Sequence, residues 1–310
     1  MPELPDLTVY LDALRKRILG RRLEGVRLQS AFVVRTVTQP VSLVGREVTD
    51  LHLIGKRIVF ELTGERFMVV HLMIAGRFQW KDSGAPPKNR IVLATFTFPN
   101  GTLVLTEASP KKRASIHVVE GRDQLREFDR GGLDVMAADL SAFSTRLTSE
   151  NHTLKRALTD PSLFSGIGNA YSDEILHAAR LSPLTLTSRL KPDEIERLWC
   201  SVQSTLTQWT TRLRSAAGDV FPMKVTAFHP DMAVHGRYRQ PCPVCSTPVQ
   251  HIVYADNECN YCPTCQTGGR LLADRGMSRL LRSDWPKSLD EWDAHVEARR
   301  VTPPATSRSD

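Results

Sequence analysis

The sequence predicts an α+β protein with an N-terminal antiparallel β-sandwich, a helical middle part and a cysteine-rich C-terminal module. Short strand-like segments punctuated by glycine and proline fill residues 23–120, which is typical of an antiparallel sandwich. Helical patterns dominate from about residue 123, and five of the six cysteines fall between Cys242 and Cys265. A chain of 310 residues has room for about two domains and a small added module.

The N-terminal part begins with a predicted helix over residues 5–20, which Asp6 caps and Gly20 ends. Strands are predicted at residues 57–62, 67–72, 91–98 and 102–106. The last two flank Pro99-Asn100-Gly101, which is a hairpin turn signal.

Four helices are predicted in the middle of the chain, at residues 139–148, 151–159, 171–180 and 192–214. Ser215 to Asp219 reads as a flexible loop, Cys200 as a small buried residue, and the tail from Thr302 as disordered. The predicted domains are a β-sandwich with its N-terminal helix, a helical domain, a cysteine module, and a basic extension with the tail, covering residues 1–122, 123–233, 234–269 and 270–310.

The composition points to a protein with a polyanionic partner. Lys plus Arg is 41 and Asp plus Glu is 34, which gives a net charge of +7. No run of about 18 apolar residues exists, so the sequence predicts neither a transmembrane helix nor membrane association. The N-terminus lacks the pattern of a signal peptide, so we expect a cytoplasmic protein, in which structural disulfides are rare.

The cysteines form two C-x₂-C pairs, Cys242 with Cys245 and Cys262 with Cys265. This spacing is typical of a four-thiolate zinc site, and four protein ligands leave no open position, so one structural zinc ion per chain is expected. Cys259 and Cys262 make an alternative pair, and the shared C-P-x-C form favours Cys262 with Cys265.

The N-terminus and one glycine loop carry candidate chemistry. Removal of Met1 would leave Pro2 with a terminal amine that titrates near 8 and can attack an aldehyde carbon, and Glu3 beside it can move protons. Gly166-Ile167-Gly168-Asn169 precedes a predicted helix and could hold a phosphate, with Lys155 one helix upstream.

Taken together, these segments resemble the formamidopyrimidine-DNA glycosylase / endonuclease VIII family over about residues 1–270. The resemblance is carried by the N-terminal Met-Pro-Glu-Leu-Pro, Gly55-Lys56-Arg57, His71-Leu72, Leu154-Lys155, the stretch from Gly166 to Leu176 and the four cysteines.

The resemblance implies a β-sandwich, a helix–two-turns–helix domain and a zinc β-hairpin around a DNA-binding cleft, in a monomer. It implies that Pro2 attacks C1′ of a damaged nucleoside, that Glu3 transfers protons and that Lys56 supports catalysis at the phosphate. The activity implied is a base-excision DNA glycosylase that also cleaves the abasic site by β- and δ-elimination. The residues implied to contact DNA are His71, Ile74, Lys111, Lys112, Arg113, Lys155, Gly166, Gly168, Asn169 and Asn257.

Several positions depart from the family pattern. Ile74 stands where the family has a Met wedge, Lys111-Lys112-Arg113 replaces a loop with an Arg and a Phe, and Asn257 replaces an Arg. These departures leave the lesion open, and with it the choice between duplex and single-stranded DNA. Two alternatives remain: an abasic-site lyase with little glycosylase activity, and a damaged-DNA-binding protein without catalysis.

Overall fold

The computed structural model describes residues 1–82, 89–222, 225, 228–254, 257–273, 285–292, 294 and 297. Its N-terminal part consists of two four-stranded antiparallel sheets, in the strand orders β1-β6-β7-β5 and β2-β3-β4-β8. The elements of this part are α1 (Leu4–Ile18), β1 (Gly25–Leu28), η1 (Ala31–Val33), η2 (Pro40–Leu43), β2 (Val48–Ile54), β3 (Arg57–Leu62), β4 (Arg66–His71), β5 (Gly76–Lys81), β6 (Val92–Phe98), β7 (Gly101–Glu107) and β8 (Ser115–Glu120).

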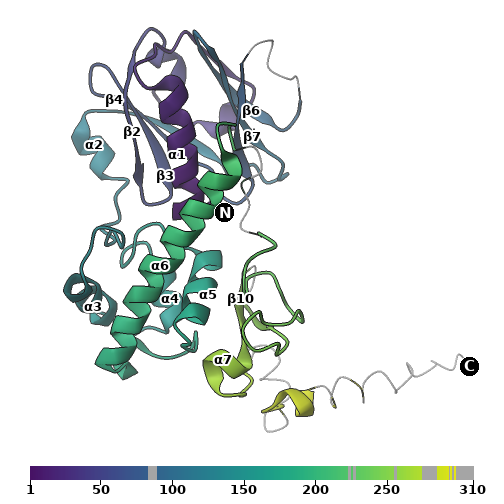
Figure 1. Ribbon diagram of the computed structural model, residues 1–310. Helices are drawn as coiled ribbons and strands as arrows, with labels where there is room; N and C mark the ends of the chain where they lie inside the picture. Colours follow the sequence, from purple (N-terminus) through teal and green to yellow (C-terminus); the bar gives the residue numbers. More distant parts are fainter. Residues whose placement is uncertain are drawn as a thin grey trace, which may run out of the picture.

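A helical part follows, and a cysteine-bearing hairpin closes the described fold (Figure 1). The remaining elements are α2 (Arg122–Arg126), α3 (Leu140–Thr148), α4 (Leu154–Thr159), α5 (Asn169–Ala178), η3 (Thr187–Arg189), α6 (Pro192–Ala217), β9 (Gln250–Tyr254), β10 (Asn257–Tyr261) and α7 (Pro263–Thr267). The predicted fold class, α+β with an antiparallel sandwich, a helical domain and a cysteine hairpin, is confirmed. No helix within the described residues is long and apolar enough to span a lipid bilayer.

Each part has its own hydrophobic core. Tyr10, Phe60, Phe78 and Phe96 are fully buried in the sandwich core, which also takes in the apolar stripe of α1. The helical core gathers Phe143, Phe164 and Tyr171 with one face of α6. The candidate site described below is formed by residues that lie between these two cores.

The helix α1 begins at Leu4, the fourth residue of the chain, and a hydrogen bond across its first turn holds its start. Glu3 occupies the N-cap position, and the Asp6 carboxylate accepts a hydrogen bond from the Glu3 amide at 2.9 Å. Asp6 therefore completes the cap from inside the first turn, whereas the sequence had predicted it as the cap residue itself. The consequence is a fixed orientation for the Glu3 backbone at the entrance to the helix.

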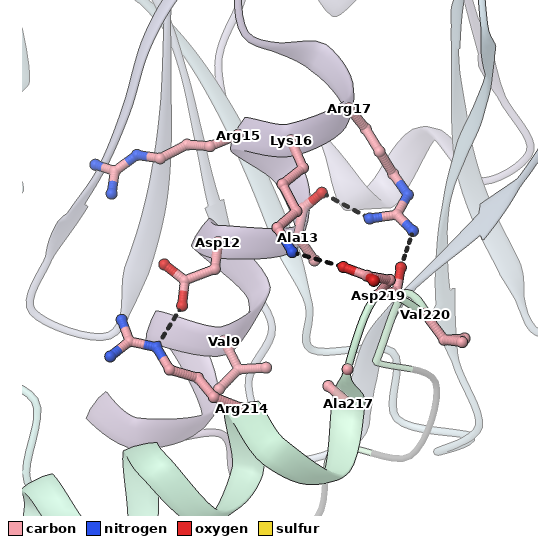
Figure 2. A pocket seen from close by; sticks show the side chains of 11 residues that line it. Val9, Asp12, Ala13, Arg15, Lys16, Arg17, Arg214, Ala217, Asp219 and Val220 are labelled. Atoms are coloured by element: carbon pink, nitrogen blue, oxygen red, sulfur yellow. Dashed lines mark hydrogen bonds and ion pairs between the residues drawn. The ribbon is translucent and has the colours of Figure 1, made fainter.

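The long helix α6 joins the helical part to the sandwich, because its C-terminal end packs beside α1 (Figure 1). Arg214 donates to Asp12 at 2.7 Å, and Lys16 and Arg17 contact the Asp219 carboxylate and carbonyl, both at 3.0 Å (Figure 2). These contacts border a pocket of about 420 Å³.

Two expectations for this helix are corrected. It continues to Ala217, so most of the predicted loop from Ser215 is helical and Asp219 is bonded to α1. Cys200, expected to be buried, lies on its exposed face. Helical periodicity alone does not say where a helix stops when a neighbouring helix continues to support it.

Candidate active site and metal centre

The Glu3 carboxylate is buried against the N-terminus of α5. Its Oε2 accepts hydrogen bonds from the amides of Gly168 at 2.7 Å and Tyr171 at 3.2 Å, and its Oε1 accepts one from Ala170 at 2.9 Å. Free N–H groups and the helix dipole stabilise a negative charge at this position. Folding therefore holds an acidic group, next to Pro2, in a single orientation.

The glycine loop serves this contact, which differs from the expected phosphate cradle. The Gly168 amide is taken by Glu3, and a Cβ at this position would lie 2.5 Å from both the Glu3 carboxylate and Lys56 Nζ. Gly166 adopts a φ of +80° and accepts a hydrogen bond from the Leu4 amide at 3.0 Å. Both glycines thus let the helical part approach the N-terminus of the sandwich closely.

Lys56 reaches the same place from the turn between β2 and β3, where Gly55 has a φ of +58°. Burial lowers the pKa of Lys56, the nearby Glu3 carboxylate opposes that shift, and Lys155 adds to it. The structure therefore brings Lys56 to Glu3 beside Gly168, although 53 residues separate them in the sequence, and Pro2 precedes Glu3 in the chain.

A pocket of about 270 Å³ opens at this point, lined by Met1, Lys56, His71, Phe128 and Gly166 among others. Burial lowers the pKa of the Met1 amino group, and it lowers the pKa of His71 to about 4, with Arg57 and Lys56 contributing. His71 is therefore neutral at neutral pH and offers a ring N–H without a charge.

Lys155 is placed differently from the sequence expectation of a DNA contact. Its ammonium donates to the Asn169 carbonyl at 2.6 Å, to Ser172 Oγ at 2.9 Å and to the Asp173 carboxylate at 2.5 Å. These three bonds use all of its donors inside the protein, so Lys155 holds the Gly166–Asn169 loop in place through the Asn169 carbonyl.

The predicted wedge residues lie on two exposed turns of the sandwich. Ile74 is 61% exposed in the turn between β4 and β5, which Gly76 closes by donating to the Leu72 carbonyl. Lys111 and Arg113 are exposed in the turn between β7 and β8.

Lys112 folds back instead and donates to the Glu107 carbonyl. The Glu107 carboxylate fixes this turn by accepting the amides of Arg113 at 2.9 Å and Ala114 at 3.0 Å.

Four cysteine sulfurs lie together at the base of the hairpin. The Sγ atoms of Cys242, Cys245, Cys262 and Cys265 are within 4.8 Å of one another, with pairs at 3.4, 3.5 and 3.9 Å. A tetrahedral site with Zn–S bonds of about 2.3 Å needs sulfurs about 3.8 Å apart, so this donor set fits zinc.

Cys259 lies apart from this group, buried in β10, so the four sulfurs that come together are those of the two C-P-x-C pairs. The His177 ring, on α5, contacts Cys242 Sγ at 3.3 Å, a contact that the sequence alone did not indicate.

Asn257 begins β10 opposite Tyr254, and its side chain lies outside the described part of the chain. Of the predicted basic extension, Arg270 is described and exposed, whereas Arg275, Arg279 and Arg282 lie outside that part.

Comparison with known proteins agrees with this architecture. Residues 1–113 match the formamidopyrimidine-DNA glycosylase N-terminal domain, and residues 133–215 match the formamidopyrimidine-DNA glycosylase H2TH domain. The chain therefore belongs to the formamidopyrimidine-DNA glycosylase / endonuclease VIII family, as the sequence motifs predicted.

An uncharacterized formamidopyrimidine-DNA glycosylase-like protein of Mycobacterium tuberculosis is 39% identical over 162 residues, which is 52% of this chain and 99% of that protein. A formamidopyrimidine-DNA glycosylase of Symbiobacterium thermophilum is 28% identical, over 86% of this chain and 89% of that protein. The Lactococcus lactis enzyme solved in complex with abasic-site DNA has the same fold, with a TM-score of 0.75, 23% identity, and coverage of 86% of this chain and 99% of that one.

Proposed function

We propose that this protein is a base-excision DNA repair enzyme that removes damaged bases and cleaves the strand at the resulting abasic site. The observation that carries the proposal is that the Glu3 carboxylate, next to Pro2 in the chain, meets Lys56 Nζ beside Gly168 and is fixed by three amides of the α5 N-terminus. A pocket lined by Met1 and Lys56 lies at this place. Relatives over 86% of the chain bear the name of a DNA glycosylase, which supports the reaction class.

The proposed reaction begins once Met1 is removed and Pro2 carries a secondary amine. The amine nitrogen attacks C1′ of the damaged nucleoside, the C1′–base bond breaks, and the base leaves with a proton. Glu3 assists by moving a proton at the sugar as its ring opens, which gives an iminium at C1′. Loss of the C2′ proton then expels the 3′ phosphate, and a second elimination expels the 5′ phosphate.

The other predicted residues have roles in holding the DNA. Lys56, neutral His71 and the Asn169 side chain contact backbone phosphates near the lesion, and the base is extruded because C1′ is shielded inside an intact stack. Ile74, Lys111 and Arg113 enter or flank the gap that the extruded base leaves. Gly166 and Gly168 shape the loop, and Asn257 at the hairpin contacts phosphate.

The four cysteines hold one zinc ion that keeps the hairpin folded. DNA is the binding partner, and it contacts the sandwich, the helical part and the hairpin. The protein acts as a monomer in the cytoplasm, where it works on the nucleoid. Four thiolates leave no coordination position for substrate, so the metal has a structural role in this proposal.

The test is borohydride trapping on DNA that contains a single abasic site. Protein beginning at Pro2 should form a covalent complex, and protein that keeps an extra residue before Pro2 should form none. Equal strand cleavage by the two proteins would exclude Pro2 as the nucleophile, and absence of both trapping and cleavage would favour the non-catalytic DNA-binding alternative.

A second candidate function is an abasic-site lyase with little glycosylase activity. It is favoured by the turn at Lys111–Arg113, which carries cations in place of a planar wedge to fill the gap left by a flipped base. Rapid cleavage of abasic DNA without release of any base from a panel of oxidised purines and pyrimidines would support it.

A further inference from the structure

A fully buried carboxylate, Asp173 on α5, lies where the catalytic loop, the helical part and the cysteine hairpin meet. Its side chain has no exposed surface. It accepts hydrogen bonds from Lys155 Nζ at 2.5 Å, the Asn260 amide at 3.1 Å and the Asn260 side chain at 3.3 Å, and it bonds His235 Nδ1 at 2.8 Å. A buried charge of this kind is tolerated only when it is paired and fully hydrogen-bonded.

On one side, Asp173 reaches the catalytic loop through a single residue. Lys155, bonded to Asp173, also donates to the Asn169 carbonyl at 2.6 Å. The adjacent amides of Gly168 and Ala170 hold the Glu3 carboxylate. A shift of Lys155 would therefore move the backbone that orients Glu3.

On the other side, Asp173 reaches the metal hairpin just as directly. Asn260 lies in β10, two residues before Cys262, and gives Asp173 both its backbone and its side-chain donors. His235 belongs to the segment that leads into the first cysteine pair. Without the docked hairpin, Asp173 would keep Lys155 but lose the donors of Asn260.

We propose that Asp173 is a positioning residue that makes the order of the Glu3-binding loop depend on the docked, metal-loaded hairpin. The low dielectric of the site strengthens every bond of this network, and the loss of one partner weakens the others. The consequence for catalysis rests on the function proposed above. The alternative is that the hairpin only grips DNA, in which case loss of the metal would weaken binding and leave the loop unchanged.

The first test measures amide hydrogen exchange in residues 168–171 of the full chain without DNA, before and after the metal is removed with a chelator. Exchange in the native protein should rise at least tenfold when the metal is removed. Asp173→Asn with metal bound should already exchange fast, and removal of its metal should add little, because coupled changes are not additive. If the exchange rate of these amides in the native protein is the same with and without metal, the proposal is overturned.

A matched control comes from Gln266 on α7, whose side chain donates to the Leu181 carbonyl at 2.9 Å and accepts the Cys262 amide at 2.8 Å. Within the described residues it makes no hydrogen bond to Asp173 or to the Asp173 partners Lys155, His235 and Asn260. Gln266→Ala, checked for full metal content, should leave exchange at residues 168–171 close to native. If Asp173→Asn does not fold, Asn260→Ala removes only the side-chain donor and should raise exchange part of the way. An equal rise in Gln266→Ala and Asn260→Ala would show a general loosening of the hairpin and overturn the specific role of Asp173.

The second test separates the rate of the chemical step from DNA binding, in single turnovers on abasic DNA with saturating enzyme. Asp173→Asn should lower the maximal rate by about tenfold to a hundredfold, because small misplacements of reacting groups cost this much. Gln266→Ala should change mainly the half-saturating concentration. A change confined to half-saturation in Asp173→Asn would contradict the proposal, whereas inactivity of the native protein would count against the proposed function and leave the exchange result standing.

Discussion

The catalytic loop and the wedge turns contact the same DNA in the proposed complex, yet they are built in opposite ways. Around Glu3 the backbone donors are already used: the amides of Gly168, Ala170 and Tyr171 all bond to one carboxylate. Ile74 and the cations Lys111 and Arg113 project from two turns that fold without them. The difference teaches that folding itself fixes the orientation of the Glu3 carboxylate, whereas the exposed side chains of the two turns are not held by the fold.

The largest expected effect comes from adding a single methyl group to the loop that holds Glu3. Gly168→Ala would place a Cβ 2.5 Å from the Glu3 carboxylate and Lys56 Nζ, so one of the two groups must move. We expect base excision and abasic-site cleavage to fall by about a hundredfold or more, since positioning errors of 1 Å have this effect.

Rates on both substrates, with the melting temperature as a control for folding, check this expectation. Ile74→Ala serves as the matched change on an exposed wedge turn, and it should leave abasic-site cleavage within a few fold of native. A mild effect of Gly168→Ala would show that the loop is not preorganised.

Glu3→Gln sharpens the comparison by separating the two reactions. An amide keeps the size of the side chain but cannot transfer a proton, and general acid–base help contributes about 10²–10⁴ in rate. Base excision needs proton movement at an intact nucleoside, whereas an abasic aldehyde is already an electrophile. Excision should therefore fall more than cleavage, and equal losses on both substrates would remove Glu3 from this role.

The metal centre offers a comparison between two cysteines only three residues apart. Cys262→Ser should lose the bound metal and weaken DNA binding, because Cys262 Sγ belongs to the four-sulfur cluster, whereas Cys259→Ser should keep its metal. Metal content per chain by elemental analysis, with the unfolding of the sandwich followed in parallel, distinguishes the two. Metal retained in Cys262→Ser and lost in Cys259→Ser would reverse the ligand assignment.

The wedge turns should give smaller effects that depend on salt and on strand context. Each duplex phosphate neutralised contributes about −0.9 to the slope of log affinity against log salt. Lys111→Ala with Arg113→Ala should therefore flatten this slope by about 2, and Lys112→Ala should change it little because Lys112 is bonded to Glu107.

The same turns should discriminate weakly between the four bases opposite a lesion, and activity on single strands should be comparatively good. Excision of one lesion, placed in single strands and opposite each base, measures this. A strong preference for duplex with one opposite base would show that these turns, or others, still read the partner strand.

The smallest expected effect concerns stability near the N-terminus. Burial raises the pKa of Asp6 from 3.8 to about 7, so the folded state holds a proton that the unfolded chain has released. The stabilisation from this group is fully present below about pH 4 and is lost as pH rises towards 7. The variant Asp6→Asn has no ionisable group at this position and therefore does not lose this stabilisation as pH rises. Its melting temperature minus that of the native protein should become more positive from pH 4 to pH 7. A constant difference across this range would contradict the assignment.

Local sequence alone determined much of this protein. Short apolar segments between glycine and proline, together with the Pro99-Asn100-Gly101 turn, located the strands β3, β4, β6 and β7 to within a residue or two, because chain breakers and tight turns impose local rules. The cysteine spacing picked out the four sulfurs that come together, since two tight knuckles need C-x₂-C pairs. The motif at the N-terminus predicted Pro2 and Glu3 as site residues, and the structure places Glu3 with Lys56 beside Gly168.

Only the tertiary structure decided how the polar groups are partnered. The sequence could not show that the glycine loop bonds Glu3, that Lys155 turns inward, or that Asp173 joins the loop to the hairpin, because these partners lie up to 168 residues apart. The end of α6 and the exposure of Cys200 were missed for the same reason. Hydrogen-bond partners of a buried polar group are fixed by which surfaces pack together, and that choice is made by the whole fold.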